Sequence, residues 1–293
     1  MRLEVLIKWA SLLPLSLARA LGGLLGLLTW LLSSKYRERF HDNWRLAIEH
    51  IKHGNPSAPP SESLSMFRAL TQAGCLAGEL PAIWCNPKAV ERMTIEGWDL
   101  VEDLLAEGRG LIVLTPHLGA FELGARAFAR RYPLTVLYRP SPSPTMEKLL
   151  QRFRPAEQLT AVPASGTGVR TLLRTLKSAG VIGILPDQVP SQGDGIWANF
   201  FGRPAYTMTL PVRLAKATKA PLIWVLAVRR PGGWSLIFKP WRVSEAAACD
   251  ESNRLSQDVQ AMNHQLEDLI VMVPEQYLWG YNRYRGRPPS SSD

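Results

Sequence analysis

Residues 110–122, which read GLIVLTPHLGAFE, decide the fold. Residues Gly110 to Thr115 predict a short strand, and their continuously apolar character is typical of a strand covered on both faces. Pro116 and Gly119 interrupt the pattern, and a helical segment follows at about 120–131. We therefore expect a buried strand, a loop and a helix in succession, the repeating unit of α/β proteins.

The same alternation continues on both sides of this stretch. A helical stripe of apolar residues precedes it at 98–105. The further elements that the sequence predicts are strands at 134–138, 158–162, 181–185, 221–228 and 234–238, and helices at 145–153, 169–179 and 251–272. This order favours an α/β fold with a central mixed, largely parallel sheet and helices on both faces.

His117 is the first candidate for chemistry, because functional groups collect at the carboxyl ends of strands in such sheets. Glu122 follows five residues later. On a regular helix that separation is about 140° around the axis, so the two side chains meet only if His117 lies in the loop before the helix. A carboxylate bonded to one ring nitrogen would leave the other nitrogen free as a base. The pair therefore suits deprotonation of a hydroxyl, although a surface ion pair would show the same spacing.

Several other classes of site lack their sequence signals. The chain has three cysteines, Cys75, Cys85 and Cys249, and they show no metal-ligand spacing. No GxSxG or GxxxxGK[ST] motif occurs, and Thr171 occupies the third glycine position of a dinucleotide fingerprint that begins at Gly166. We expect neither a metal nor a bound cofactor.

The N-terminus is almost wholly apolar from residue 5 to residue 32, broken by Lys8 and Arg19. Trp9 and Trp30 lie near its two ends, as interfacial anchors do. A membrane anchor that spans or half-inserts fits this length, while a cleaved signal peptide and a buried helix remain alternatives. The apolar run continues past the possible cleavage site and ends in the basic segment 35–39, which the positive-inside rule places in the cytoplasm.

Charge narrows the choice of partner. The chain carries 34 Lys and Arg against 25 Asp and Glu, a formal net charge of +9. Nucleic acid, anionic lipid and phosphorylated metabolites would all satisfy this charge. Ten tryptophans favour a membrane interface, and nucleic-acid binding does not explain the apolar N-terminus. A second helical stripe at 36–51 packs on the core or lies on the bilayer, and a Pro/Ser-rich break follows at 55–63.

Several ordered segments together resemble a known family. They are His117 to Glu122, Tyr138 to Ser141 (YRPS), Gly166 to Arg170 (GTGVR), Leu185 to Gln188 (LPDQ), Asn199 to Gly202 (NFFG) and Pro274 to Arg285 (PEQYLWGYNRYR). With the N-terminal anchor, this order resembles the bacterial lipid A biosynthesis acyltransferases of the lysophospholipid acyltransferase superfamily. The resemblance covers nearly the whole chain.

The resemblance implies transfer of a fatty acyl chain from an acyl carrier protein thioester to a hydroxyl of a phosphorylated lipid A precursor. It implies His117 as general base, Glu122 as the residue that orients it, and no covalent acyl-enzyme. It also implies an anchor at 1–34, an acyltransferase domain at 35–293, and a place at the cytoplasmic face of the bacterial inner membrane. The expected partners are acyl carrier protein, an anionic glycolipid acceptor and inner-membrane lipid, with no nucleic acid. A lysophospholipid or another glycolipid as acceptor, or a membrane lipid-binding protein without catalysis, are the alternatives.

Three further residues are candidates for substrate binding. By the resemblance, Arg139 contacts the substrate or the transition state, for which its planar guanidinium is suited. Arg170 either binds an anion at the start of a helix or is a solvated helix residue. Asp187 follows a buried strand and either orients the site loop or only forms a turn beside Pro186.

Two further segments are candidates for contacts with the acyl chain or with anionic partners. The NFFG turn and residues 204–209 are expected to shape an acyl groove. Arg283, Arg285 and Arg287 are expected to form a basic tail that holds lipid phosphates or the acidic carrier protein, with a solvated tail as the alternative.

Overall fold

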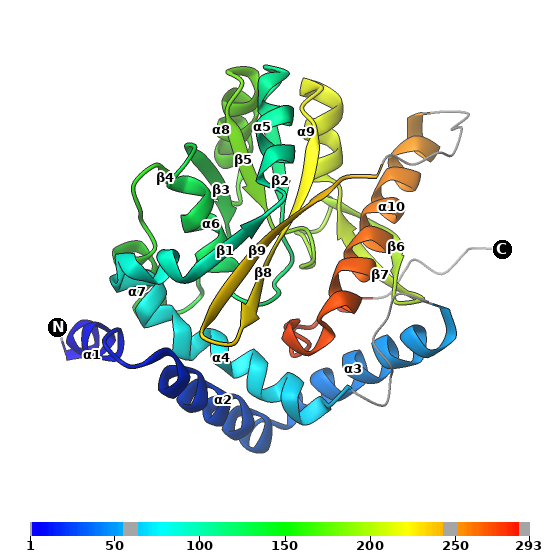
Figure 1. The fold of residues 1–293 in the computed structure, drawn as a ribbon. Helices are drawn as coiled ribbons and strands as arrows, with labels where there is room; N and C mark the ends of the chain where they lie inside the picture. The colour runs from blue at the N-terminus through cyan, green and yellow to red at the C-terminus, as the bar shows by residue number, and fades with distance from the viewer. Residues whose placement is uncertain (1, 55–63, 243–250, 287–293) are drawn as a thin grey trace.

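A twisted sheet lies at the centre of the computed structural model, which describes residues 2–54, 64–242 and 251–286 (Figure 1). Its seven strands lie in the order β1-β9-β8-β2-β5-β3-β4. The strands are β1 (Met93–Glu96), β2 (Leu111–Leu114), β3 (Leu134–Tyr138), β4 (Leu159–Pro163), β5 (Val181–Ile184), β8 (Leu222–Arg230) and β9 (Gly233–Pro240). The β8–β9 pair is antiparallel and every other neighbouring pair in the sheet is parallel. The predicted mixed, largely parallel sheet is confirmed.

Helices cover both faces of the sheet. They are α1 (Arg2–Ala10), α2 (Leu15–Leu32), α3 (Ser34–Gly54), α4 (Met66–Cys85), α5 (Trp98–Ala106), α6 (Phe121–Ala129), α7 (Pro144–Phe153), α8 (Gly166–Lys177), α9 (Leu210–Thr218) and α10 (Glu251–Met272). In β2, Leu111 and Val113 join one buried cluster, with side chains of α5 and α6. Ile112 and Leu114 join the other, with side chains of α3, α8 and α10. All four residues are buried, because successive side chains of a strand point to opposite faces and both faces are covered.

Several elements had not been predicted. β1, α4, α9 and the antiparallel hairpin of β6 (Gly195–Phe200) and β7 (Arg203–Met208) are additions to the expected order. α4 lies between α2 and the sheet-bearing core, so it has contacts on more than one side and no single apolar stripe. The break expected at 55–63 lies outside the described residues.

The apolar N-terminal helix α2 packs closely on α4. A Cβ on Gly22 would lie 2.6 Å from the carbonyl oxygen of Gly74, and a Cβ on Gly74 would lie 2.1 Å from the carbonyl oxygen of Gly22. Glycine is therefore required at both positions, because only its bare backbone lets the two helices approach this closely.

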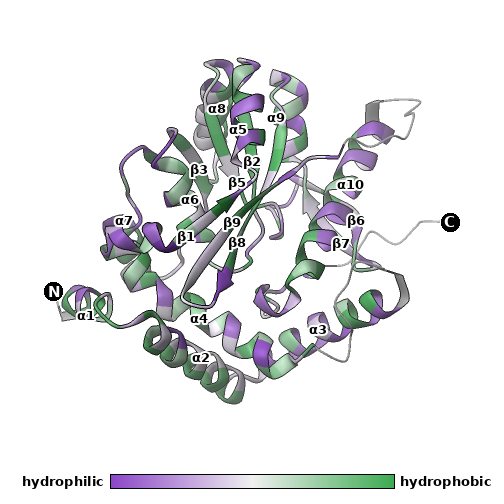
Figure 2. Ribbon diagram, in the orientation of Figure 1, coloured by the Kyte–Doolittle hydropathy of each residue, from purple (hydrophilic) through white to green (hydrophobic). Residues whose placement is uncertain are grey.

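The opposite side of α2 faces outward and is rich in leucine (Figure 2). The leucines of α2 that are exposed are Leu17, Leu21, Leu24, Leu25, Leu28, Leu31 and Leu32. Within the described part of the chain, α2 is the one helix long and apolar enough to cross a membrane. The N-terminal apolar helix that the sequence predicts is present, with one side seated on the core.

Candidate functional site

The loop between β2 and α6 carries His117, and backbone contacts on two sides hold it. The backbone N–H of Leu278 donates to the carbonyl of His117 over 3.1 Å, and the N–H of Gly119 donates to the carbonyl of Gln276 over 3.0 Å. Gly119 has a φ of +61°, and a Cβ there would lie 2.0 Å from the carbonyl oxygen of Ala227. Only glycine fits that position, so β8 and residues 276–278 together fix the path of the loop.

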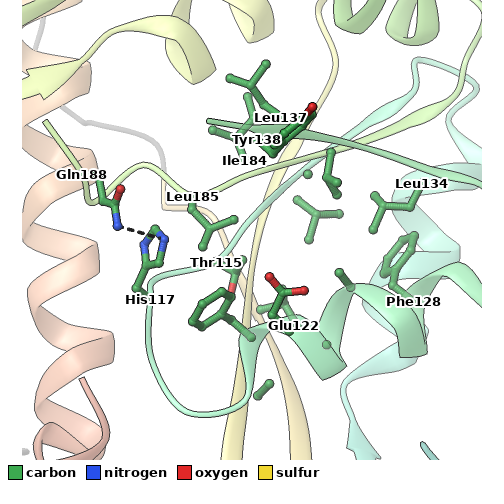
Figure 3. Close-up of a pocket in the computed structure, with 18 of the residues that line it drawn as sticks. Thr115, His117, Glu122, Phe128, Leu134, Leu137, Tyr138, Ile184, Leu185 and Gln188 are labelled. Carbon is green, nitrogen blue, oxygen red and sulfur yellow. Dashed lines mark hydrogen bonds between the residues drawn. The ribbon is translucent and has the colours of Figure 1, made fainter. Parts of the chain in front are cut away.

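The imidazole of His117 has a hydrogen-bond partner on each ring nitrogen. Nδ1 lies 2.7 Å from Oδ1 of Asp187, and Nε2 lies 3.1 Å from the side-chain nitrogen of Gln188 (Figure 3). An amide nitrogen can only donate, so Nε2 is the acceptor and the ring proton is on Nδ1, where it is donated to Asp187. The resulting neutral imidazole has its basic nitrogen on the side of Gln188.

Asp187 is almost fully buried and is held at both carboxylate oxygens by one residue. Its Oδ2 accepts the backbone N–H of His117 over 2.9 Å. Burial by itself would raise the pKa of Asp187, but the nearby His117 ring and its hydrogen bonds outweigh that effect, and the pKa lies below its usual value. The carboxylate is therefore charged at neutral pH and stabilises positive charge on the ring.

Tyr277 lies beside this pair and is buried. Burial raises the pKa of its hydroxyl well above 10, and the negative charge of Asp187 raises it further. The hydroxyl keeps its proton at neutral pH, which leaves Asp187 as the charged member of the group.

Glu122 lies in the first turn of α6, and its carboxylate forms an ion pair with the guanidinium of Arg154. The Nε of Arg154 also donates to Glu122 Oε2 over 3.3 Å. The ring nitrogen that the sequence assigns to Glu122 is bonded to Asp187 instead. The reason is sheet order: β5 pairs with β2, with Ile184 opposite Leu114, so the residues after both strands meet.

An apolar pocket of about 260 Å³ opens beside His117, between α6 and the sheet. Figure 3 shows the side chains of His117, Glu122 and Phe128 around it. The side chains that line its apolar part include Val113, Phe121, Ala125, Phe128, Leu134, Val136, Leu159, Val225, Ala227 and Leu236. Gly183 of β5 also lines the pocket, where a Cβ would lie 3.0 Å from Val136. The site therefore combines a basic nitrogen with a pocket suited to an apolar chain.

The other predicted site residues have different positions. Arg139 is exposed and lines the pocket, together with Arg154. Arg170 is exposed on α8 and is not among the lining residues. Sequence reasoning missed Gln188, Tyr277 and Arg154. Gln188 and Tyr277 lie in the segments that carry the family resemblance, whereas no sequence signal marked Arg154.

The expected acyl groove around the NFFG turn is not what the structure has. Phe200 and Phe201 are buried and pack on each other at 4.7 Å between ring centroids, and Phe201 also packs on Trp279. In the segment 199–209, Met208 is the residue that lines the pocket. The turn belongs to the core, because α10 and the C-terminal segment cover it.

Arg283 is also a core residue, contrary to the expected basic tail. Its side chain donates to the carbonyl of Tyr206 over 2.8 Å and to the hydroxyl of Thr207 over 2.7 Å. It is 2% exposed, and burial lowers its pKa. Arg285 is exposed, and Arg287 lies outside the described residues.

No group of three or more His, Cys, Asp or Glu side chains placed to bind a metal occurs among the described residues.

Comparisons with known proteins give the family. The model of the bacterial lipid A biosynthesis acyltransferase family matches residues 4–286, and the chain belongs to that family. It is 26% identical to the lipid A biosynthesis lauroyltransferase of Escherichia coli (strain K12) over 208 residues, which cover 70% of this chain and 66% of that protein. It is 27% identical to the lipid A biosynthesis palmitoleoyltransferase of the same organism, over 77% of this chain and 72% of that protein. It is 26% identical to a lipid A biosynthesis acyltransferase of Haemophilus influenzae, over 91% of this chain and 81% of that protein.

Proposed function

We propose that this protein transfers a fatty acyl chain from an acyl carrier protein thioester to a hydroxyl of a lipid A precursor. The observation that carries the proposal is a histidine, bonded through one ring nitrogen to a buried carboxylate and through the other to an amide, beside an apolar pocket. The family supports an acceptor in lipid A biosynthesis, and the names of two relatives give lauroyl and palmitoleoyl chains as their cargo.

In the proposed reaction, Nε2 of His117 takes the proton of the acceptor hydroxyl as its oxygen attacks the thioester carbonyl. The new C–O bond forms, the C–S bond breaks, and the departing thiolate takes the proton back from the imidazolium. Asp187 fixes the tautomer, and the charge of Glu122 adds to the stabilisation of the imidazolium. The Gln188 amide leaves Nε2 when the hydroxyl arrives. No acyl-enzyme and no cofactor are needed.

The remaining contacts follow from the pocket. The apolar chain of the donor occupies the space between α6 and the sheet, and the Arg139 guanidinium faces a phosphate of the donor or of the acceptor. Arg170 as a substrate residue stays a prediction from the sequence.

We propose that α2 lies flat against the cytoplasmic face of the inner membrane, with its leucine side in the lipid. The two helices that flank α2 in the chain both pack on the rest of the protein: α1 contacts α4, and α3 contributes Phe40 and Trp44 to the core. A spanning helix would separate these neighbours by the thickness of the bilayer.

Cysteine labelling tests this arrangement. Lys8→Cys and Lys35→Cys, in a background without native cysteines, should both react with an impermeant reagent from the cytoplasmic side. Reaction from opposite sides would show that α2 spans and that the flat arrangement is wrong.

The activity is tested with purified protein in lipid nanodiscs, acyl carrier protein loaded with a lauroyl or palmitoleoyl chain, and a lipid A precursor. Mass spectrometry should show the precursor with one additional acyl chain, and His117→Ala should abolish this product while membrane binding and folding persist. Acylation of a lysophospholipid or another glycolipid in place of the precursor would show that the acceptor differs from the one proposed. No acylation by the unmodified protein would favour a lipid-binding role without catalysis.

A further inference from the structure

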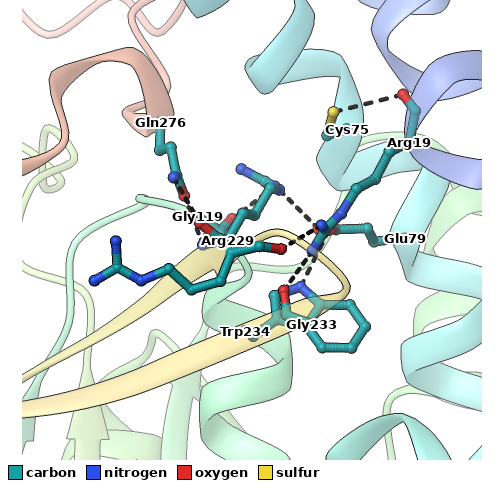
Figure 4. A network of polar contacts seen from close by, with 9 residues as sticks. Arg19, Cys75, Glu79, Gly119, Arg229, Gly233, Trp234 and Gln276 are labelled. Carbon is teal, nitrogen blue, oxygen red and sulfur yellow. Dashed lines mark hydrogen bonds and ion pairs between the residues drawn. The ribbon is translucent and has the colours of Figure 1, made fainter. Parts of the chain in front are cut away.

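A buried cluster of two arginines and one glutamate connects the N-terminal helix to the catalytic loop (Figure 4). Glu79 of α4 has no exposed surface. Its Oε1 accepts from Nε of Arg19 over 2.7 Å, and its Oε2 accepts from Nε of Arg229 over 2.8 Å. The side chain of Arg229 is 3% exposed. The two guanidinium groups thus share one buried carboxylate, and the side chain of Arg19 is 17% exposed.

Arg229 joins this cluster to the loop of the active site. Its Nη2 donates to the carbonyl of Gly119 over 2.9 Å, and Gly119 is two residues from His117. The backbone of Arg229 is itself held, because its N–H donates to Oε1 of Gln276 over 2.7 Å and its carbonyl accepts from the Gln276 amide over 3.1 Å. Asp187 holds the loop at His117, and the guanidinium of Arg229 holds it two residues further along the chain, at Gly119.

Arg19 joins the cluster to α2. Its Nη1 donates to the carbonyl of Arg230 and its Nη2 to the carbonyl of Gly233, each over 2.7 Å. The guanidinium also lies 5.2 Å from the ring centroid of Trp234, whose indole N–H donates to Glu79 Oε1 over 3.1 Å. Arg19 thereby holds the turn between β8 and β9, and this turn follows Arg229 closely in the chain.

The carboxylate of Glu79 and both guanidinium groups are already bound to partners within the protein. We therefore expect the cluster to fix the position of the loop and not to bind a ligand. Removal of Arg19 would leave one oxygen of Glu79 with the Trp234 indole as its remaining donor, and would free the two turn carbonyls. Because a buried carboxylate is costly without its partners, Glu79 would then move toward Arg229, and the guanidinium of Arg229 would leave Gly119. The loop would then lose its side-chain contact at Gly119, two residues from His117.

We propose that Arg229 is a positioning residue for His117, and that Arg19 of α2, acting through Glu79, sets that position. The seating of the bilayer-facing helix on the core is thereby coupled to the geometry of the catalytic loop. The effect on turnover rests on the proposed acyl transfer, whereas the effect on the loop does not.

The kinetic test compares Arg19→Met with Arg37→Met. Arg37 lies just beyond α2, donates to the carbonyls of Trp30 and Leu31, and has no described contact with the cluster, so its variant controls for the loss of one cation near the bilayer. Small displacements of a catalytic group cost up to about 100-fold in rate. Arg19→Met should lower kcat by about 10- to 100-fold with KM for the acyl donor nearly unchanged, while Arg37→Met should leave both unchanged.

A spectroscopic test follows the loop without any assay of activity. The proton between His117 Nδ1 and Asp187 should give a downfield NMR signal in nanodiscs, assigned by its loss in His117→Gln. This signal should shift or broaden in Arg19→Met and in Arg229→Lys, at unchanged circular dichroism and membrane binding, and stay in place in Arg37→Met.

These measurements separate the possible failures. An unchanged signal in folded Arg19→Met or folded Arg229→Lys would overturn the inference, as would equal effects of Arg19→Met and Arg37→Met on kcat. If one of the two cluster variants does not fold, the other decides. If the unmodified protein transfers no acyl chain, the proposed function is wrong, and the NMR signal still decides the role of the cluster.

Discussion

Two polar clusters hold the same short loop, and they differ in what they leave free. At His117, the buried Asp187 fixes one ring nitrogen, and the other nitrogen faces a single amide beside an open pocket. Around Glu79, two guanidinium groups and an indole are directed at one buried carboxylate, and both arginines also donate to backbone carbonyls. In the first arrangement a substrate can replace the Gln188 amide at the ring nitrogen, as a general base requires. The second is closed, which suits a group that only fixes position.

The largest effect is expected from breaking the open cluster. Asp187→Asn replaces the acceptor of the Nδ1 proton with an amide that can donate, which favours the wrong tautomer of His117. Loss of a correctly poised general base costs about 10²- to 10⁴-fold in rate. Steady-state kinetics should show this loss in kcat, with KM for the acyl donor changed little.

Glu122→Gln is the matched comparison, because Glu122 faces the same pocket but is bonded to Arg154. It should lower kcat by about tenfold, the effect of removing roughly 1.4 kcal/mol of charge stabilisation from the imidazolium. A larger loss from Glu122→Gln than from Asp187→Asn would return the orienting role to Glu122.

The closed cluster should respond in stability. Glu79→Gln leaves the buried guanidinium of Arg229 and the partly exposed guanidinium of Arg19 without a counter-charge, and breaking a buried ion pair in this way costs about 3–5 kcal/mol. Denaturant unfolding in nanodiscs or detergent, followed by circular dichroism, measures the change. The exposed Glu102→Gln serves as control, with an expected change within about 0.5 kcal/mol. Equal midpoints for the two variants would contradict the importance assigned to the cluster.

The pocket beside the open cluster should set the preferred acyl chain. Ala125→Leu adds a side chain into the space lined by α6, and steric discrimination of this kind is worth about 1–3 kcal/mol. The ratio of kcat/KM for lauroyl over palmitoleoyl transfer should rise by about 10- to 100-fold. Ala217→Leu, on the exposed side of α9, should leave the ratio as it is. An unchanged ratio in Ala125→Leu would place the acyl chain elsewhere.

A third buried carboxylate lacks the arginines that surround Glu79. Glu267 accepts the backbone N–H of Phe201 over 2.6 Å and lies 3.6 Å from His50, and burial raises its pKa to about 7. Between the ordinary glutamate pKa of 4.5 and about 7, the folded state binds more protons than the unfolded state. Its contribution to stability is therefore complete below pH 4.5 and is lost as the pH rises through 7.

Glu267→Gln keeps an acceptor for Phe201 and removes the titration. The variant should be more stable than the unmodified protein at pH 8 by about 3 kcal/mol, and the difference should fall below about 1 kcal/mol at pH 5. Thermal melts at both pH values measure this difference. A variant that is less stable at pH 8 would show that the charged carboxylate is stabilised in the fold.

Much of the local structure could be read from the sequence. The unbroken apolar run of β2 indicated a strand covered on both faces, and its position before Pro116 and Gly119 placed His117 in a loop. The apolar composition of residues 5–32 indicated the N-terminal helix, which the structure has at Leu15–Leu32. These features depend on residues within a few positions of one another, whose side-chain periodicity and backbone preferences are present in the sequence itself.

Tertiary structure alone decided which distant groups meet. Asp187 is 70 residues from His117, and the two are joined because β5 lies beside β2, a pairing that no local spacing records. The sequence predicts a basic C-terminal tail that holds lipid phosphates or the acidic carrier protein, yet Arg283 is buried because the segment folds back over the β6–β7 hairpin. The N-terminal helix looked like a separate anchor, yet Arg19 reaches a carboxylate inside the core. The sequence by itself determined most of the elements and singled out His117; the order of strands and the packing of helices determined the partners, because burial and charge pairing depend on contacts between remote segments.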